Sequence, residues 1–231
     1  MSIYHPPYLK FIKNERKTLE WLMNSPRIGN TFPNIAQSAS NSYYNLPSKD
    51  KDLLQADILF KSKFELFIAR ENRNVLIILD VQVRRSFSIS NYVISIAENS
   101  KPPYNLIRKF HFDYCRSYDY KEPKPAYHLQ YGGIETPLLN EMGISTDALT
   151  PWLSNPRICS YPMNLALLLD AIFCEFISDD TNAVVGTSEW RDFVKENEVA
   201  LLRPYLLNMS NFINGGHTSN FLIRDCLYGK Q

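Results

Sequence analysis

The sequence predicts an α+β protein: an antiparallel β-meander of about five strands, with an N-terminal helix and a C-terminal helical part packed on one face. Three observations predict this class. Apolar residues recur at helical spacing near the N-terminus, residues 58–132 are rich in β-branched and aromatic residues, and residues 162–204 return to helical spacing. The connections between the strands are too short for parallel crossovers, which need about a dozen residues. We expect residues 1–231 to form a single domain, in which segment 1–57 precedes the sheet and the helical part 133–231 follows it.

The first element is a helix over residues 8–24. Phe11 and Leu19 fall on one face of it, and charged residues occupy the opposite face. Pro26 follows this segment and signals that the helix has ended. Residues 25–48 are rich in Asn, Ser and Pro, so we expect a long irregular segment there.

Five segments with polar or proline-bearing turns between them have the composition of strands. The stretch that contains the first of them also suits a helix, because Phe60, Phe64 and Phe67 are three to four residues apart. We assign this stretch, residues 58–70, to a strand. The five predicted strands cover residues 64–70, 75–84, 92–98, 106–115 and 127–131.

The C-terminal part is predicted to be helical after an irregular segment at 132–160. Residues 162–177 begin with a proline and are apolar on nearly every side, which is typical of a helix in the core. A further helix starts at Thr187 or Ser188. Pro204 should break or kink that helix, because proline has no N–H to donate to the preceding turn.

Composition excludes several classes of function. The net charge is +1 and the pI is near 7.6, which argues against a strongly basic nucleic-acid scaffold but leaves room for a local basic patch. Only 8 glycines are present, and neither a GxGxxG nor a GxxxxGK[ST] motif occurs. Dinucleotide-binding and P-loop proteins are therefore disfavoured.

The four cysteines lie far apart and form no CxxC pair, so the sequence offers no structural zinc motif. The longest apolar run, residues 165–177, is interrupted by two acids and is shorter than the ~20 apolar residues that span a bilayer. The N-terminus does not resemble a signal peptide. We therefore expect a cytoplasmic protein with no membrane partner.

Polar residues alternate with apolar ones along three predicted strands and so fall on one face of the sheet, the polar face. If strands 106–115 and 127–131 pair, their aromatic residues point inward and their polar residues share the opposite face. A strand between them and strand 75–84, with Ser95 and Ala97 on this face, would keep it small and open. The residues grouped on the polar face are His111, Asp113, His128, Gln130, Asp80, Gln82 and Arg84.

Two imidazoles and a carboxylate on neighbouring strands predict a catalytic site. His111, Asp113 and His128 could bind zinc or manganese, or activate a water molecule, with Gln130 beside them. Asp80 cannot join the same metal, because an intervening strand places it about 9.6 Å from Asp113. The alternative is a solvated sheet face on which these side chains are simply exposed. The cofactor stays open, with a divalent metal as the candidate.

The second strand also has a loose version of the metal-binding pattern of restriction-endonuclease cores. In that pattern an acid is followed by an acid or amide and then by a base, which together hold a metal and polarise water. Asp80, Gln82 and Arg84 occupy these positions, and Glu65 is a candidate upstream acid. Arg in place of the usual Lys departs from the pattern, so this assignment stays an alternative.

The loop at 116–127 mixes aromatic and cationic residues. Such a mixture can stack bases and contact phosphates, as single-stranded nucleic-acid binders do. Two other interpretations stay open: a proline-stiffened loop whose tyrosines cover the sheet edge, and a surface for a protein partner. The binding residues proposed here are Arg116, Tyr118, Tyr120 and Lys124.

Three short segments give the chain a family resemblance over about residues 107–176. They read F-D-Y at 112–114, P-x-x-H-L at 125–129 and R-I-x-x-x-P at 157–162. In this succession the chain resembles an uncharacterised bacterial domain family. The resemblance implies a cytoplasmic bacterial protein from a mobile-element or phage-defence locus, and it transfers no catalytic residue.

Two functions follow as expectations. The first is a bacterial accessory or interaction protein, such as a component of phage defence, that acts through a protein or nucleic-acid partner. The second is a metal-dependent hydrolase, most simply a nuclease, with its His/Asp site on the polar face.

Overall fold

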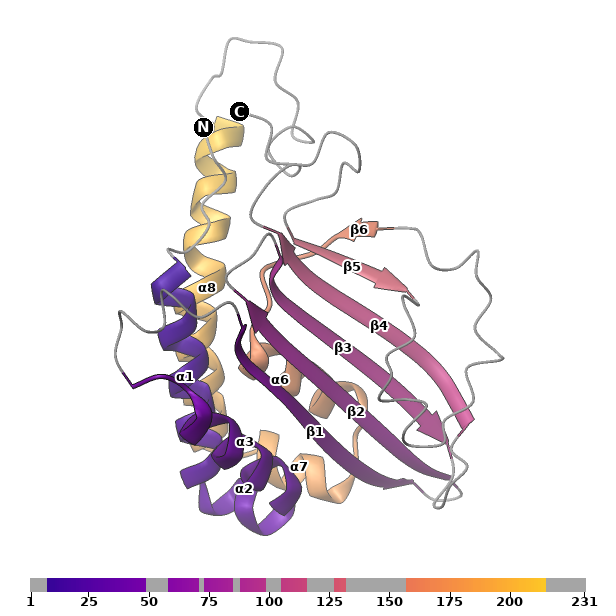
Figure 1. Ribbon diagram of the computed structural model, residues 1–231. Helices are drawn as coiled ribbons and strands as arrows, with labels where there is room; N and C mark the ends of the chain where they lie inside the picture. The colour runs from indigo at the N-terminus through magenta and orange to yellow at the C-terminus, as the bar shows by residue number, and fades with distance from the viewer. Residues whose placement is uncertain are drawn as a thin grey trace.

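A six-stranded antiparallel sheet forms the middle of the molecule, and every strand pairs with the next one along the chain (Figure 1). The computed structural model describes residues 8–48, 58–70, 73–84, 88–98, 105–115, 127–131 and 157–214. The predicted antiparallel meander is thus confirmed over its five strands, and a short sixth strand extends it. The strands are β1 (Ile58–Arg70), β2 (Arg73–Arg84), β3 (Ser88–Glu98), β4 (Asn105–Cys115), β5 (Tyr127–Tyr131) and β6 (Arg157–Cys159).

Helices from both ends of the chain lie on one side of this sheet. The core joins Leu79 and Tyr92 of the sheet to Phe173 and Trp190 of the C-terminal helices. In Figure 1, α6 lies behind the strands and α1 runs beside α8. The α+β class and the one-sided helical packing are therefore confirmed. The helices are α1 (Tyr8–Asn24), α2 (Pro26–Thr31), α3 (Pro33–Asn45), α6 (Leu165–Glu175), α7 (Asp179–Val185) and α8 (Ser188–Asn214).

The prediction of an irregular segment at 25–48 is wrong, because this segment forms α2 and α3. The Ser25 hydroxyl accepts a hydrogen bond from the N–H of Ile28 and so caps α2, and a proline opens each helix. Ile28, Ile35 and Ala39 are fully buried. Tertiary burial of this apolar stripe thus outweighs the weak helix propensity of the Asn and Ser residues around it.

The C-terminal part also departs from prediction. The segment expected to be irregular contains β6, and α7 was not predicted. Helix α6 begins at Leu165 rather than at Pro162, because the side chain of Asn164 caps it by accepting from the N–H of Leu167. Pro204 does not end α8, which continues for ten residues beyond it to Asn214.

A buried polar cluster joins α1 to the sheet and to α6. Glu15 of α1 is a charged residue, yet it is fully buried. Its Oε1 accepts from the Tyr92 hydroxyl at 2.9 Å and from the N–H of Leu165 at 3.1 Å. Its Oε2 is buried, and no residue in the described ranges hydrogen-bonds to it. Burial, only partly offset by those two hydrogen bonds, raises the Glu15 pKa from 4.5 to about 7.

Within the described residues, we find no helix with the length and apolar character needed to cross a membrane.

Candidate functional site

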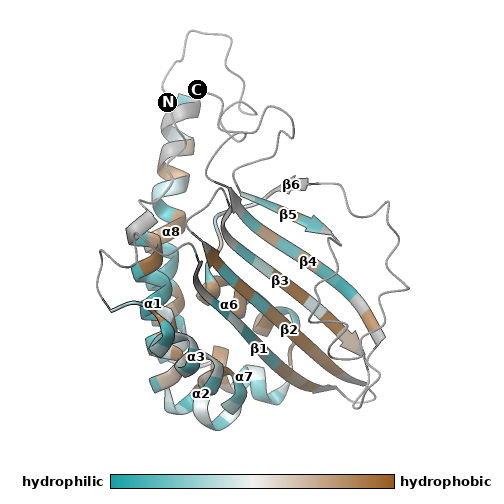
Figure 2. Ribbon diagram, viewed as in Figure 1, coloured by the Kyte–Doolittle hydropathy of each residue, from teal (hydrophilic) through white to brown (hydrophobic). Residues whose placement is uncertain are grey.

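The strand register brings polar residues of four strands into one row across the sheet. Gln82 of β2 pairs with Asn91 of β3, Asn91 pairs with Asp113 of β4, and Asp113 pairs with His128 of β5. In the neighbouring row, His111 pairs with Gln130. Residues directly opposite each other in an antiparallel sheet project from the same face. The register therefore unites His111, Asp113, His128 and Gln130 on the polar face, opposite the helices. Figure 2 shows β4 and β5 as mainly hydrophilic.

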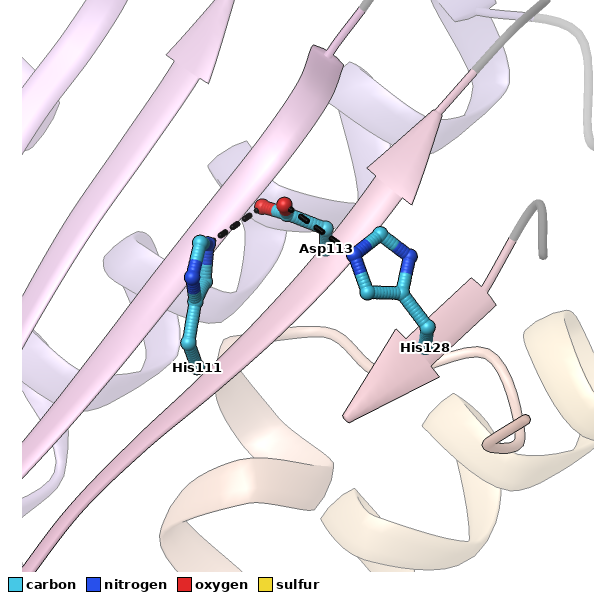
Figure 3. A network of polar contacts seen from close by, with 3 residues as sticks. All are labelled: His111, Asp113 and His128. Atoms are coloured by element: carbon cyan, nitrogen blue, oxygen red, sulfur yellow. Dashed lines mark hydrogen bonds and ion pairs between the residues drawn. The ribbon is translucent and has the colours of Figure 1, made fainter. Parts of the chain in front are cut away.

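Asp113 bridges two imidazoles, as Figure 3 shows. Nε2 of His111 lies 2.8 Å from Oδ1 of Asp113, and Nε2 of His128 lies 3.4 Å from Oδ2 of the same carboxylate. The ring centroids of the two histidines are 6.5 Å apart. Each imidazole thus contacts a different carboxylate oxygen, and the three side chains form one network, the His–Asp–His network.

The three members of this network differ in exposure. The exposed fraction of the side chain is 1% for His128, 10% for Asp113 and 19% for His111. His111 is therefore the member that a solute can reach. The expectation that the polar face is open is wrong at its centre, because Ser95 and Lys109 are buried.

The Asp113 carboxylate is ionised throughout the physiological pH range. Burial on its own would raise its pKa, but hydrogen bonds from His111 and His128 and the charges of the two rings outweigh burial and hold the pKa well below its usual 3.8. An ionised carboxylate only accepts hydrogen bonds, so the Nε2 atom of His111 must carry a hydrogen. In the uncharged form of the ring, this tautomer leaves the lone pair on Nδ1, and no residue that the structure describes bonds to that atom.

Lysines of β1 and β4 lie on the same face. Lys63 pairs with Asp80 across β1 and β2, and the charges of Lys61, Lys63 and Lys109 all reach Asp80. Burial raises the Asp80 pKa, and these three lysines offset part of the rise. Lys63 also forms an ion pair with Glu65. The β1 side of the polar face therefore carries Lys61 and Lys63 together with the acids Glu65 and Asp80, and Lys61 is exposed there.

The arrangement of the His–Asp–His network fits hydrogen bonding better than metal ligation. Nowhere in the described ranges do three His, Cys, Asp or Glu side chains converge closely enough to hold a metal ion. The two Nε2 atoms are directed at separate oxygens of Asp113, and a zinc ion would need ligand distances of about 2.0–2.2 Å in place of these contacts. β3 separates Asp80 of β2 from Asp113 of β4, as the sequence predicts.

The other predicted site residues have separate positions. Gln82 lies in the same row as Asp113, two strands away, and Arg84 is the last residue of β2. Glu65 lies on β1, where its register partner is Ile78. The loop residues Arg116, Tyr118, Tyr120 and Lys124 are outside the described residues.

Sequence reasoning missed two parts of this face. Asn91 lies directly opposite Asp113, and its Oδ1 is buried without a hydrogen-bond partner among the residues that the structure describes. The lysines of β1 were also missed. The same alternation would have found them, because Lys61 and Lys63 flank Ser62, which projects from the buried side of β1.

Comparison with protein-family models, with curated proteins and with solved structures finds no match to this chain. The candidate site therefore rests on its geometry alone.

Proposed function

We propose that the protein is a hydrolase of nucleic-acid phosphodiesters in which His111 is the general base. One observation carries this proposal: an ionised, largely buried carboxylate bridges two imidazoles, and one of these reaches solvent on a face that also carries an exposed lysine, Lys61. Asp113 fixes the tautomer and orientation of His111, so that Nδ1 is available to a substrate. The lysines of β1 would contact a phosphate elsewhere on the same nucleic-acid strand.

The proposed step transfers one proton to the protein. Nδ1 of His111 removes a proton from a water molecule as the water oxygen forms a bond to phosphorus. The bond from phosphorus to the leaving oxygen breaks, and that oxygen takes a proton from solvent. Lys61 and Lys63 lie three strands from His111, at about 14 Å, so they would hold a neighbouring phosphate of the strand rather than the reacting one.

The substitution His111→Gln should lower the cleavage rate about 100-fold or more while the fold is kept. The amide nitrogen of Gln can still donate to Asp113, but the side chain cannot accept a proton. The measurement is cleavage of labelled RNA and single-stranded DNA, with circular dichroism as the folding check. Lys195→Ala, at an exposed position of α8, is the control that should leave the rate unchanged. Equal rates in His111→Gln and the unaltered protein would overturn the proposal.

The same assay decides whether a metal takes part. If the network acts by acid–base chemistry alone, cleavage persists in excess chelator. If His111, Asp113 and His128 hold a divalent ion, chelator abolishes cleavage and Zn²⁺ or Mn²⁺ restores it.

A second candidate function is supported by exposed apolar residues on α8. Val199, Leu206 and Leu207 are 49%, 50% and 54% exposed, and the first two are seven residues apart on one side of the helix. Val199 also lines a groove of about 940 Å³ between α1 and α8, beside Trp21 and Phe193. This surface supports an accessory protein that binds a protein partner. A cytoplasmic bacterial setting in phage defence, which the family resemblance implies, fits either function.

The double substitution Val199→Asp with Leu206→Asp should abolish binding to such a partner, because it places charge in the apolar surface. Candidate partners are the products of the adjacent genes, co-expressed and tested by size-exclusion chromatography. Ser188→Asp introduces the same charge at an exposed position of α8 that does not line the groove, and it should leave binding intact. A complex that survives the double substitution would count against this surface.

A further inference from the structure

The groove between α1 and α8 has an aromatic floor. The rings of Trp21 and Phe193 are stacked there, with their centroids 4.1 Å apart and their planes inclined by 8°. Phe193 is buried, but Trp21 is only partly buried, so apolar surface faces the groove. The groove has a volume of about 940 Å³, and Figure 1 shows α1 running beside α8. Two packed helices therefore form its walls, and stacked rings form its floor.

Carboxylates outnumber amines among the side chains that line this groove, by four to two. Three of the acids follow one another on α8 at intervals of three and four residues, so they lie along one side of that helix, and the fourth lies on α1. None of the six charged groups forms an ion pair within the part of the chain that the structure describes. The groove thus has an excess of negative charge on a protein whose net charge is +1. The six residues are Glu20, Glu189, Asp192, Glu196, Lys17 and Lys195.

The shape of the groove suits a third helix. α1 and α8 run antiparallel, because Trp21 contacts Phe193 near one end while Asn14 bonds to Asn197 further along both helices. The lining residues of α8 lie between positions 189 and 200, a length of about 18 Å at 1.5 Å per residue, or about three helical turns. A groove between two packed helices is a surface on which the apolar side of an amphipathic helix can dock.

We infer that this groove binds an amphipathic helix of a partner protein, and that the polar side of this helix carries lysine or arginine. Its cationic side chains pair with the carboxylates of α8, and its apolar side covers Val199 and the rings of Trp21 and Phe193. An arginine placed over Trp21 gains a cation–π contact as well. This inference rests on the second candidate function and deepens it, because it gives the charge and shape of the partner segment.

The test uses synthetic peptides as probes. The first is a helical peptide of about 18 residues, long enough to reach from the groove to Leu206, with leucines on one side and lysines on the other. One control peptide has glutamates in place of the lysines, and a second has the same composition with leucines on every side. Fluorescence anisotropy of the labelled peptides with the full chain measures the dissociation constants. We expect the basic amphipathic peptide to bind at least about tenfold more tightly than either control.

Neutralising two acids of the groove isolates the contribution of charge. Asp192→Asn with Glu196→Gln should weaken binding of the basic peptide about fivefold, and the difference should shrink as salt is added. Asp180→Asn with Glu198→Gln removes the same charge from exposed positions that do not line the groove, and it should leave the affinity unchanged.

Two results with the peptides would overturn this inference: equal affinity for the basic peptide and either control, or an affinity that Asp192→Asn with Glu196→Gln leaves unchanged. A third result would do so without peptides. If the unaltered protein is a dimer by size-exclusion chromatography and Val199→Asp makes it monomeric, the occupant of the groove is a second copy of this chain.

Failure of this inference is distinguishable from failure of the proposed functions. A complex with a neighbouring gene product that is lost in Val199→Asp with Leu206→Asp but kept in Asp192→Asn with Glu196→Gln removes only the cationic helix. Peptide binding that depends on the groove acids, together with a normal cleavage rate in His111→Gln, removes only the hydrolase.

Discussion

Replacing Asp113 with asparagine should lower the free energy of unfolding by about 3 kcal/mol at pH 7, because two imidazoles lose the buried charge to which they donate. Cleavage should fall with it, by about 100-fold or more, since His111 loses the acceptor that fixes its tautomer. Chemical denaturation and the RNA assay measure the two effects.

The loss of stability should depend on pH in a defined direction. The Asp113 pKa is lowered in the folded chain, so the carboxylate stabilises the fold above its ordinary pKa of 3.8 and this contribution disappears as the pH falls below it. The gap between the unaltered protein and Asp113→Asn should therefore be constant near neutrality and shrink below about pH 4. Asp192→Asn, at an exposed position of α8, is the matched control. A gap that persists unchanged at pH 3 would mean that charge is not its cause.

Replacing Glu15 with glutamine should remove a pH dependence of stability. Between pH 4.5 and about 7 the folded chain keeps a proton on Glu15 that the unfolded chain has released, so the unaltered protein loses stability as the pH rises through this window. The full loss is about 3 kcal/mol. Glutamine resembles the protonated acid in shape and still accepts from Tyr92 and Leu165, but it does not ionise.

Chemical denaturation at pH 4.5 and pH 8 gives the free energy of unfolding of the unaltered protein and of Glu15→Gln, and the effect is the difference between them. Relative to Glu15→Gln, the unaltered protein should lose about 3 kcal/mol between these pH values. Glu20→Gln changes an exposed glutamate of the same helix and should leave the pH dependence as it is. Parallel curves for the unaltered protein and Glu15→Gln would show that Glu15 is not protonated in the fold.

The sheet could be predicted from sequence because the signals that specify it lie within each strand and the turn that follows it. Each strand pairs with its neighbour in the chain, and β-branched and aromatic runs with short connections are enough to predict such a meander. Helices α2 and α3 could not be predicted in this way, because Asn and Ser favour turns and only burial of Ile28 and Ile35 against the rest of the chain makes their segment helical. In the same way, α8 continues through Pro204, and Leu201 and Tyr205 on either side of the proline are buried.

The candidate site shows the same division between local and distant causes. Alternation with period two identifies the strand face of His111, Asp113 and His128, but it does not say how deeply that face is buried. The alternation along their own strands does not tell that His128 and the Asn91 oxygen are buried. Glu15 was open to prediction, because it is spaced four residues from both Phe11 and Leu19, which places it on the apolar stripe of α1.

The unequal strand lengths bear on self-association. An exposed edge strand offers unpaired N–H and C=O groups to another chain and so can seed aggregation. Here one edge of the sheet ends in β6, which has only three residues, and the other edge is β1, which carries Lys61 and Lys63 and contacts α3. A short edge is a poor template, and repulsion between lysines opposes the approach of a second copy. The lysines that we assign to phosphate binding would then also help to keep the protein dispersed at high concentration.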